Sequence, residues 1–550
     1  MDKPPCIAMN PAWVVLGAYI LAMVIFAAWA RRDSSDDDES YYLASRGLSG
    51  VVLLITMAAT NFSSFTVYGS SGVAYGIGLS FLPIMAFGTG FMSVSMYLIG
   101  KRVRGLSLKH SAMTAPEIVR GQTGSQNAQI TMAAILVIAT IPYLALQPRA
   151  AGIVISALFG GPEWLGSVLI TLLIIAYTLS GGLKAVVRTD VAQGAIALLL
   201  LWLGLGMVIG HLGGLNAAME GIASSDSTAG LLSREGNYTL LIWTSTMLLW
   251  FFADPMFPQL FQRLCAADSD RSIGRMVTFY PIVAWLAFLP PILIGTMGHL
   301  EYPSMDSGSD KILPNLVIDA GGEWFGGLIL VAGLAALMST MDSQLLATGS
   351  LVTRDLMQKG EDGAIASREI VISSLAVLGL GLSLWSDLSI FDLGLLAFSM
   401  YAVLFPSVFL ALRTEDLEGR AVISSILVGE GIVLLAILYP QAFAGWWVEP
   451  IGLAMPTVVI PALIGSIIAL CSVQFVLSKE SNIFKGIISI DKFPKPMIGL
   501  IAIFVLAQDF WWWDSGEIVA LGMPIWVLWA FFLSIAQTAV LAKWTAEDAR

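Results

Sequence analysis

Hydroxyl side chains recur along an apolar segment near residue 340. The segment contains Ala336, Ser339, Thr340 and Ser343, which are spaced as i, i+3, i+4 and i+7. In an α-helix this spacing places all four on one face. Such a face could pack closely against a neighbouring membrane helix, or its hydroxyls could join main-chain carbonyls as ligands of a hard cation, which prefers oxygen. Asp342 beside this face favours a functional role, because ionisable residues at membrane depth are costly.

A second polar stretch covers residues 58–72. Nine of its fifteen residues are Asn, Ser, Thr or Gly. Asn, Ser and Thr compete with the helical backbone for hydrogen bonds, and Gly weakens a helix further. The stretch therefore predicts a broken helix, which a membrane tolerates only where the break is buried in protein or lines a cavity. Carbonyls freed at such a break can coordinate Na+, and the half-helix ends can meet a solute.

The composition identifies the broad class of protein. The chain has 550 residues, of which 57% are hydrophobic and only 12% charged. A soluble protein of this length needs more charge, and apolar runs of about 20 residues recur, the length of a membrane helix. The three cysteines and three histidines are isolated, so we expect neither an enzyme nor a metal centre built from them. The net charge of −11 and the lack of a basic tract predict no nucleic-acid partner.

Hydropathy predicts fifteen membrane spans. They cover residues 13–30, 51–75, 78–100, 130–158, 164–179, 185–209, 238–261, 276–298, 324–352, 370–385, 390–412, 422–439, 453–477, 497–510 and 521–542. In this layout all but four of the 28 Lys and Arg residues fall on the side of Arg31, as expected for cytoplasmic loops. We therefore expect a multi-pass protein of the cell membrane, with its N-terminus outside and its C-terminus in the cytoplasm.

Four motifs, in order along the chain, carry a family resemblance. They are Asn61-Phe-Ser63 with Gly69-Ser-Ser-Gly72, then Gly181-Gly-Leu-Lys-Ala-Val-Val-Arg-Thr-Asp190-Val-Ala-Gln193, then Pro258-Gln-Leu-Phe-Gln-Arg263-Leu-Cys-Ala-Ala267, and last Ala336-Leu-Met-Ser-Thr-Met-Asp342-Ser-Gln-Leu-Leu346. Over about residues 40 to 410 the chain resembles the sodium:solute symporter family. The resemblance implies an all-α polytopic membrane protein with a leucine-transporter-like core of two inverted five-helix repeats.

This fold divides the chain into three regions. Residues 1–50 would form one extra N-terminal helix and an acidic cytoplasmic loop. The ten-helix symporter core would occupy residues 51–412, and about four additional transmembrane helices would follow in residues 413–550.

The resemblance also implies a sodium site. Its ligands would be the carbonyls of Ala59 and Phe62 at the broken helix, the carbonyl of Ala336, and the hydroxyls of Ser339 and Thr340. Five neutral oxygens suit a monovalent cation and lack the carboxylates that would favour Ca2+. Na+ is therefore the expected coupling ion, and helix packing is the alternative use of the hydroxyls.

A second ion site is expected from the same resemblance. In some members of the family an aspartate at the position of Asp190 binds a second Na+ with a nearby serine, here Ser343, and Asp342 would lie in the same region. Alternatively, Asp190 could cap a helix N-terminus, and Asp342 could carry a proton.

The solute would bind beside the broken helix, near the middle of the membrane. Asn61, Ser63 and Thr66 match solute-contacting positions of the family. Weaker candidates are Phe81, Gln147 and Phe257.

Arg149 lies deep within a predicted span and could bind an anionic solute, because arginine pairs bidentately with carboxylates. Alternatively it could extend to the membrane interface or pair with Glu430 or Asp392. Family members that carry sugars have Gln or Glu where this chain has Phe65 and Thr66, so a sugar is disfavoured.

Together these features predict a Na+-coupled secondary active symporter. It would import a small polar solute, a carboxylate or an amino acid, by alternating access, with the lipid bilayer and the solute as partners and no obligate protein partner. The alternatives are a proton-coupled transporter of the same fold and a solute sensor. For a sensor we expect no output domain in this chain, because only residues 543–550 follow the last span. An intramembrane enzyme would need a nucleophile–base pair or a metal cluster, and the sequence indicates neither.

Overall fold

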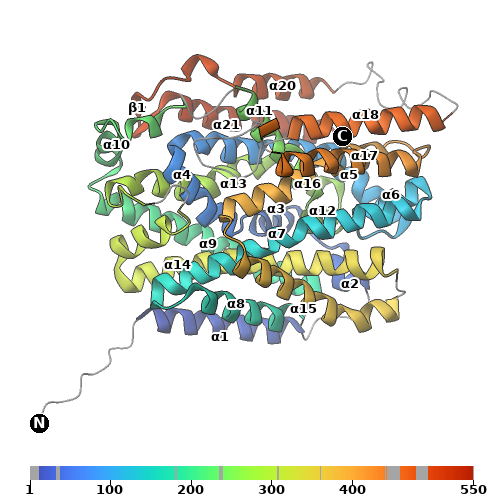
Figure 1. The fold of residues 1–550 in the computed structure, drawn as a ribbon, viewed down its shortest axis with the longest axis horizontal. Helices are drawn as coiled ribbons and strands as arrows, with labels where there is room; N and C mark the ends of the chain where they lie inside the picture. Colours follow the sequence, from blue (N-terminus) through green and yellow to red (C-terminus); the bar gives the residue numbers. More distant parts are fainter. Residues whose placement is uncertain are drawn as a thin grey trace, which may run out of the picture.

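A computed structural model gives the architecture. It describes residues 11–31, 38–179, 182–234, 240–305, 309–358, 361–439, 441–442, 459–478 and 494–548. Nearly all of these residues are helical, and the long helices run in broadly the same direction through the molecule (Figure 1). The helices α1, α8 and α15 lie along one edge, and α18, α20 and α21 lie along the opposite edge (Figure 1).

The helices of the first half are α1 (Pro11–Arg31), α2 (Asp38–Leu43), α3 (Gly50–Asn61), α4 (Ser70–Ile77), α5 (Gly88–His110), α6 (Ala115–Thr123), α7 (Gln126–Phe159), α8 (Glu163–Thr178), α9 (Gly182–His211) and α10 (Leu215–Ala223). The later helices are α11 (Leu240–Ala253), α12 (Pro258–Cys265), α13 (Asp270–Met297), α14 (Ile312–Ser350), α15 (Glu361–Trp385), α16 (Ile390–Ala411), α17 (Gly419–Leu438), α18 (Val459–Leu477), α20 (Lys495–Leu506) and α21 (Ile525–Glu547). A hairpin of β1 (Ile518–Ala520) and β2 (Met523–Pro524) precedes α21.

Short helical turns complete the chain. Turns of π-helix cover Phe65–Gly69, Pro83–Phe87 and Leu351–Leu356. Turns of 3-10 helix cover Ala44–Arg46, Gly78–Ser80, Ala229–Leu232, Asp254–Met256, Gly298–Leu300 and Phe510–Trp512.

The predicted spans agree with the helices of the described residues. Eleven are long and apolar enough to cross a membrane, or thirteen if each bent pair is one span, and the shorter apolar helices Pro11–Met23 and Glu163–Ala176 occupy the other two predicted spans. The predicted start at residue 324 coincides with a break inside α14, where Gly322 has the non-helical angles φ 62° and ψ −173°. The part of α14 before this break, which begins at Ile312, falls outside the predicted span. Residues 453–458 of another predicted span lie outside the described residues.

Two spans are sharply bent. The first combines α3 with residues 65–80 at an angle of 62°, and the second combines α11 with α12 at 55°. At the first bend Phe62 has extended backbone angles, φ −83° and ψ 92°, within the predicted polar stretch. At the second bend Pro255 and Pro258 remove backbone donors that a continuous helix would need. The bends fall in the first and sixth of the ten core spans, so they are equivalent positions in two five-helix repeats.

Packing divides the core into two groups of spans. In one group α13 contacts α3, α4 and α5, and α5 also contacts α11. In the other group α7 contacts α8, α14 and α15. The helix α9 packs on both α14 and α3, while α16 packs on both α7 and α11. The break in α3 therefore lies against α14, at the boundary between the two groups.

Candidate functional site

Side-chain hydroxyls of α14 meet the carbonyls at the end of α3. Ser339 donates from Oγ to the carbonyl of Ala59 at 2.8 Å, and Thr340 donates from Oγ1 to that of Thr60 at 3.0 Å. Both hydroxyls also lie near the carbonyl of Ala336, at 3.1 and 3.2 Å. All of these residues are buried. The structure thus gathers four of the five predicted sodium ligands at one point of contact.

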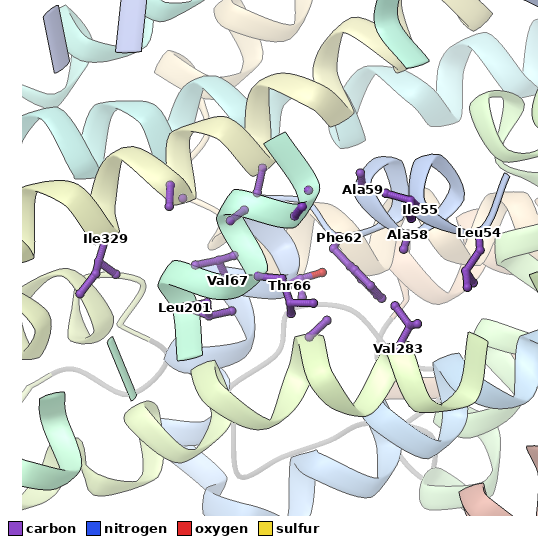
Figure 2. A pocket seen from close by; sticks show the side chains of 18 of the residues that line it. Leu54, Ile55, Ala58, Ala59, Phe62, Thr66, Val67, Leu201, Val283 and Ile329 are labelled. Atoms are coloured by element: carbon purple, nitrogen blue, oxygen red, sulfur yellow. The ribbon is translucent and has the colours of Figure 1, made fainter. Parts of the chain in front are cut away.

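The fifth predicted ligand, Phe62, lies on the wall of a cavity beside this contact (Figure 2). The cavity has a volume of about 240 Å³ and is also lined by Ala59, Thr66 and Ala336. Its remaining walls are largely apolar and come from α3, α9, α13 and α14. The extended backbone at Phe62 takes its carbonyl out of the helical hydrogen-bond pattern of α3.

A glycine of α9 allows the end of α3, where the break lies, to pack closely against α9. The Cβ atom that a side chain would add at Gly194 lies 2.7 Å from the Cβ of Ala59, closer than two carbon atoms can approach. Any larger residue at position 194 would push the end of α3 away from α9. Sequence reasoning did not identify this contact, because it joins residues far apart in the chain.

The ligand set fits a monovalent cation. Its members are carbonyl and hydroxyl oxygens without a formal charge, which suits Na+ better than Ca2+. Among the described residues, no group of three or more His, Cys, Asp or Glu side chains is placed to hold a metal ion. A cation at this point would take over the carbonyls that now accept hydrogen bonds from Ser339 and Thr340.

Asp190 lies in a buried cluster around Arg263, which adjoins this contact through Thr60. The carboxylate oxygen Oδ2 of Asp190 lies 2.6 Å from Nη2 of Arg263 and accepts hydrogen bonds from Thr56 and Thr60 at 2.7 and 3.1 Å. The same Nη2 donates to Oγ of Ser343 at 2.8 Å. The alternative that Asp190 caps a helix is wrong, because α9 begins at Gly182, two turns earlier.

Asp342 is buried on a different side of α14 from this cluster. Its charge acts on Tyr19 of α1, whose hydroxyl accepts a hydrogen bond from Gln193 of α9 at 3.0 Å. The second-site candidates Asp190 and Ser343 therefore share a cluster, and Asp342 belongs with α1.

Asn61 connects the two bent spans. Its side-chain amide donates to Oδ2 of Asp254 at 3.2 Å and to the hydroxyl of Tyr280 at 2.9 Å. Asp254 lies at the bend between α11 and α12 and is almost completely buried. The two breaks therefore meet through a hydrogen bond between an amide and a carboxylate.

The other solute candidates surround the first break. Gln147 accepts a hydrogen bond from the backbone nitrogen of Ser64 at 3.3 Å, and Ser63 accepts one from that of Phe65 at 3.2 Å. Thr66 lies on the cavity wall (Figure 2).

The two aromatic candidates lie in ring clusters. Phe257 packs against Tyr143 and Phe398, with ring centroids 5.2 and 5.0 Å away. Phe81 packs at 5.3 Å on Phe391, which stacks on Phe65.

Arg149 lies near the end of α15. Its Nη1 donates to the carbonyl of Ser386 at 2.8 Å, and its charge acts on Asp310 and Asp392. Asp310 lies outside the spans, and burial raises its pKa to about 7, against the opposing effect of Arg149. Among the described residues, the solute candidates at the first break make no hydrogen bond to Arg149.

Two residues of these clusters were missed by sequence reasoning. Arg263 lies in a family motif, but no role is predicted from the sequence for it or for Asp254. Both carried a signal, because each is an ionisable residue next to or within an apolar predicted span.

Comparison with known proteins gives the family of the chain. A model of the sodium:solute symporter family matches residues 41–429. The osmoregulated proline transporter OpuE of Bacillus subtilis is 26% identical over an alignment of 483 residues, which covers 85% of this chain and 95% of the relative. The sodium/pantothenate symporter of Escherichia coli is 25% identical and aligns with 77% of this chain and 89% of its own length.

A solved structure has the same fold. It is a Na+-coupled sialic acid symporter in a substrate-bound outward-open state, with a TM-score of 0.70 and 18% sequence identity. The match covers 85% of this chain and 98% of that one. The family model covers more than half of the chain. This multi-pass membrane protein belongs to the sodium:solute symporter family, with Na+ as its coupling ion.

Proposed function

We propose that the protein imports a small polar solute together with Na+ by alternating access, with Na+ held between α3 and α14. The observation that carries this proposal is the meeting of the Ser339 and Thr340 hydroxyls with the carbonyls of Ala59, Thr60 and Ala336. These oxygens belong to helices of the two packing groups. A cation bound by both would fix one relative position of the groups.

The energetics favour inward transport. Each positive charge that moves inward gains about 2.3 kcal/mol per 100 mV of membrane potential, in addition to the Na+ concentration term. When the ion leaves, the hydroxyls of α14 can again donate to the carbonyls at the break. The break therefore keeps its polar groups satisfied in both conditions, which membrane depth requires.

The proposal includes the orientation of the chain in the membrane and its division into three regions. The excess of Lys and Arg on the side of Arg31 supports the proposal that the N-terminus lies outside and the C-terminus in the cytoplasm. Residues 51–412 would be the transporting core, with residues 1–50 and 413–550 added around it. Proton coupling through Asp342 or Asp190 is the alternative within the same fold.

The solute is proposed to carry a carboxylate, as an organic acid or an amino acid. Two relatives are named for pantothenate and proline, and each of these molecules has a carboxylate. Arg149 is the proposed partner of that group, although Asp310 and Asp392 already balance part of its charge.

A sodium-dependent shift in melting temperature should depend on Thr340. We expect NaCl to raise the melting temperature of the purified protein above that in choline chloride of equal ionic strength, since a ligand that binds only the folded state stabilises it by about 2.7 kcal/mol at a hundred times its Kd. Thr340→Ala should lose the shift. The matched control is Thr348→Ala, which removes another buried threonine hydroxyl from α14 and should keep the shift. A shift retained in Thr340→Ala would contradict the proposed ligand set.

Arg149→Gln should separate solute transport from Na+ binding. In proteoliposomes with an inward Na+ gradient, we expect this variant to lose at least tenfold in the uptake of any carboxylate solute that the wild type accumulates, because a charge-assisted pair is lost. Its sodium-dependent melting shift should remain. Lys109→Gln, at an exposed ion pair with Glu415, is the control and should transport normally. Uptake by Arg149→Gln at the wild-type rate would remove Arg149 from the solute site.

A second ion at Asp190 would compete with Arg263. Removing the guanidinium by Arg263→Gln should lower the stability by about 3–5 kcal/mol, because the Asp190 carboxylate is left buried without its cation. Asp190→Asn combined with Arg263→Gln should recover part of that loss. The sodium titration of the melting temperature tests the ion count, and we expect a single-site curve for the wild type. A two-site curve that becomes single-site in Asp190→Asn would instead assign a second Na+ to Asp190.

A further inference from the structure

Asp254, at the bend between α11 and α12, is a buried carboxylate without a cationic partner among the described residues. Its side chain is 1% exposed, and Oδ2 accepts one hydrogen bond, from the amide of Asn61 at 3.2 Å. The other oxygen, Oδ1, has no hydrogen-bond partner among the described residues. The ion pairs of the described chain do not include Asp254, whereas the comparably buried Asp190 has Arg263 at 2.6 Å.

An unbalanced carboxylate in this environment has a large energetic cost. Removing a carboxylate from water costs several kcal/mol even after the protein relaxes, and one amide donor returns only part of that. Such a group in a membrane protein is therefore expected to meet a cation that the polypeptide itself does not supply. A proton, Na+ and a cationic group of the solute are the three candidates.

The surroundings of Asp254 are aromatic. Trp250 and Phe257 lie four residues before and three residues after it, and both contact Phe398, with centroids 5.4 and 5.0 Å away. The ring of Tyr143 lies 4.9 Å from that of Phe398, and the charge of Asp254 acts on Tyr143. Aromatic rings attract organic cations through their faces, and quaternary ammonium groups are bound in proteins by such clusters.

The same surroundings do not suit Na+. A hard cation takes a shell of oxygen ligands. Among the described residues, the group that hydrogen-bonds to the Asp254 carboxylate is the amide nitrogen of Asn61, and the same nitrogen donates to the hydroxyl of Tyr280. The proposed sodium site has the opposite character, with clustered carbonyls and hydroxyls and no carboxylate. The two breaks therefore differ in chemistry, and a cationic nitrogen fits the second better than a metal ion does.

We propose that Asp254 and the rings of Tyr143, Trp250, Phe257 and Phe398 bind a cationic nitrogen of the transported solute, so that the solute is an amino acid, a betaine or another amine. This inference rests on the proposed function and specifies its solute class. Because Asp254 is almost completely buried, the nitrogen reaches it in a conformation that separates α11 from α3. The hydrogen bond from Asn61 connects that movement to the break at the sodium site.

The test compares solutes that differ by one nitrogen. Melting temperatures of the full-length protein in saturating NaCl would be measured with the twenty amino acids, glycine betaine and choline, and with nitrogen-free analogues of the same shape. The matched pairs are proline with cyclopentanecarboxylate, and glycine betaine with 3,3-dimethylbutanoate. We expect at least one nitrogen-bearing solute to bind the wild type, and its analogue to bind at least tenfold more weakly. Binding confined to nitrogen-free acids, or no binding by any nitrogen-bearing solute, would overturn the proposal.

Substitutions of Asp254 test whether this residue causes the preference for nitrogen-bearing solutes. Asp254→Asn should weaken binding of the nitrogen-bearing solute at least tenfold and leave that of its analogue unchanged, while Asp254→Glu should keep the preference for nitrogen. Glu430→Gln, which removes a half-buried carboxylate from α17, is the control and should bind as the wild type does. Equal binding by Asp254→Asn and the wild type would overturn the assignment. If Asp254→Asn fails to fold, the preference of wild type and Asp254→Glu for the charged nitrogen decides.

The two proposals fail in different ways. Loss of the sodium-dependent melting shift in the wild type, with nitrogen selectivity retained, would contradict Na+ binding between α3 and α14 and leave the role of Asp254 intact. A normal sodium shift without nitrogen selectivity would contradict only the role of Asp254.

Discussion

The broken helix α3 depends on hydrogen bonds from α14. At membrane depth no water satisfies carbonyls that leave a helix, so a break must find partners within the protein. The hydroxyls of Ser339 and Thr340 supply them at 2.8 and 3.0 Å. The groups that make the break tolerable are also oxygen atoms of the kind that bind Na+, so the proposed ion site and the fold would use the same contact. At the boundary between the two packing groups, the proposed ion would fix their relative position.

The two buried carboxylates Asp190 and Asp254 differ in their partners. Asp190 is balanced by Arg263 and by the hydroxyls of Thr56 and Thr60, so its charge is used within the protein. Asp254 accepts one hydrogen bond from an amide and has no cationic partner among the described residues, and we propose that a solute nitrogen fills that role. The proposed sodium ligands carry no formal charge. In this proposal Na+, the ion pair of Asp190 with Arg263 and a solute nitrogen would each have different partners within a small part of the membrane core.

Local patterns in the sequence predicted much of this structure, but contacts between residues far apart in the chain could not be predicted from it. Hydropathy located the spans, and helical spacing put Ser339 and Thr340 on one face, because both patterns depend on neighbouring residues. The break near Phe62 followed from the run of Asn, Ser and Gly. In contrast, the pairing of Asp190 with Arg263, and that of Asn61 with Asp254, join residues on different spans, and only the folded packing determines them. The predicted span from residue 324 begins at the break in α14 at Gly322. The helical segment before this break, from Ile312, was missed because it is much shorter than a membrane span.

The most direct test of Na+ binding between α3 and α14 is equilibrium binding of radioactive 22Na+ to the purified protein without solute. The wild type should bind it saturably, with displacement by unlabelled Na+ but not by K+. Ser339→Ala combined with Thr340→Ala should abolish that binding, while its melting temperature in KCl shows that the fold persists. Wild-type 22Na+ binding by the folded double variant would contradict the account, because the ion would then be held elsewhere.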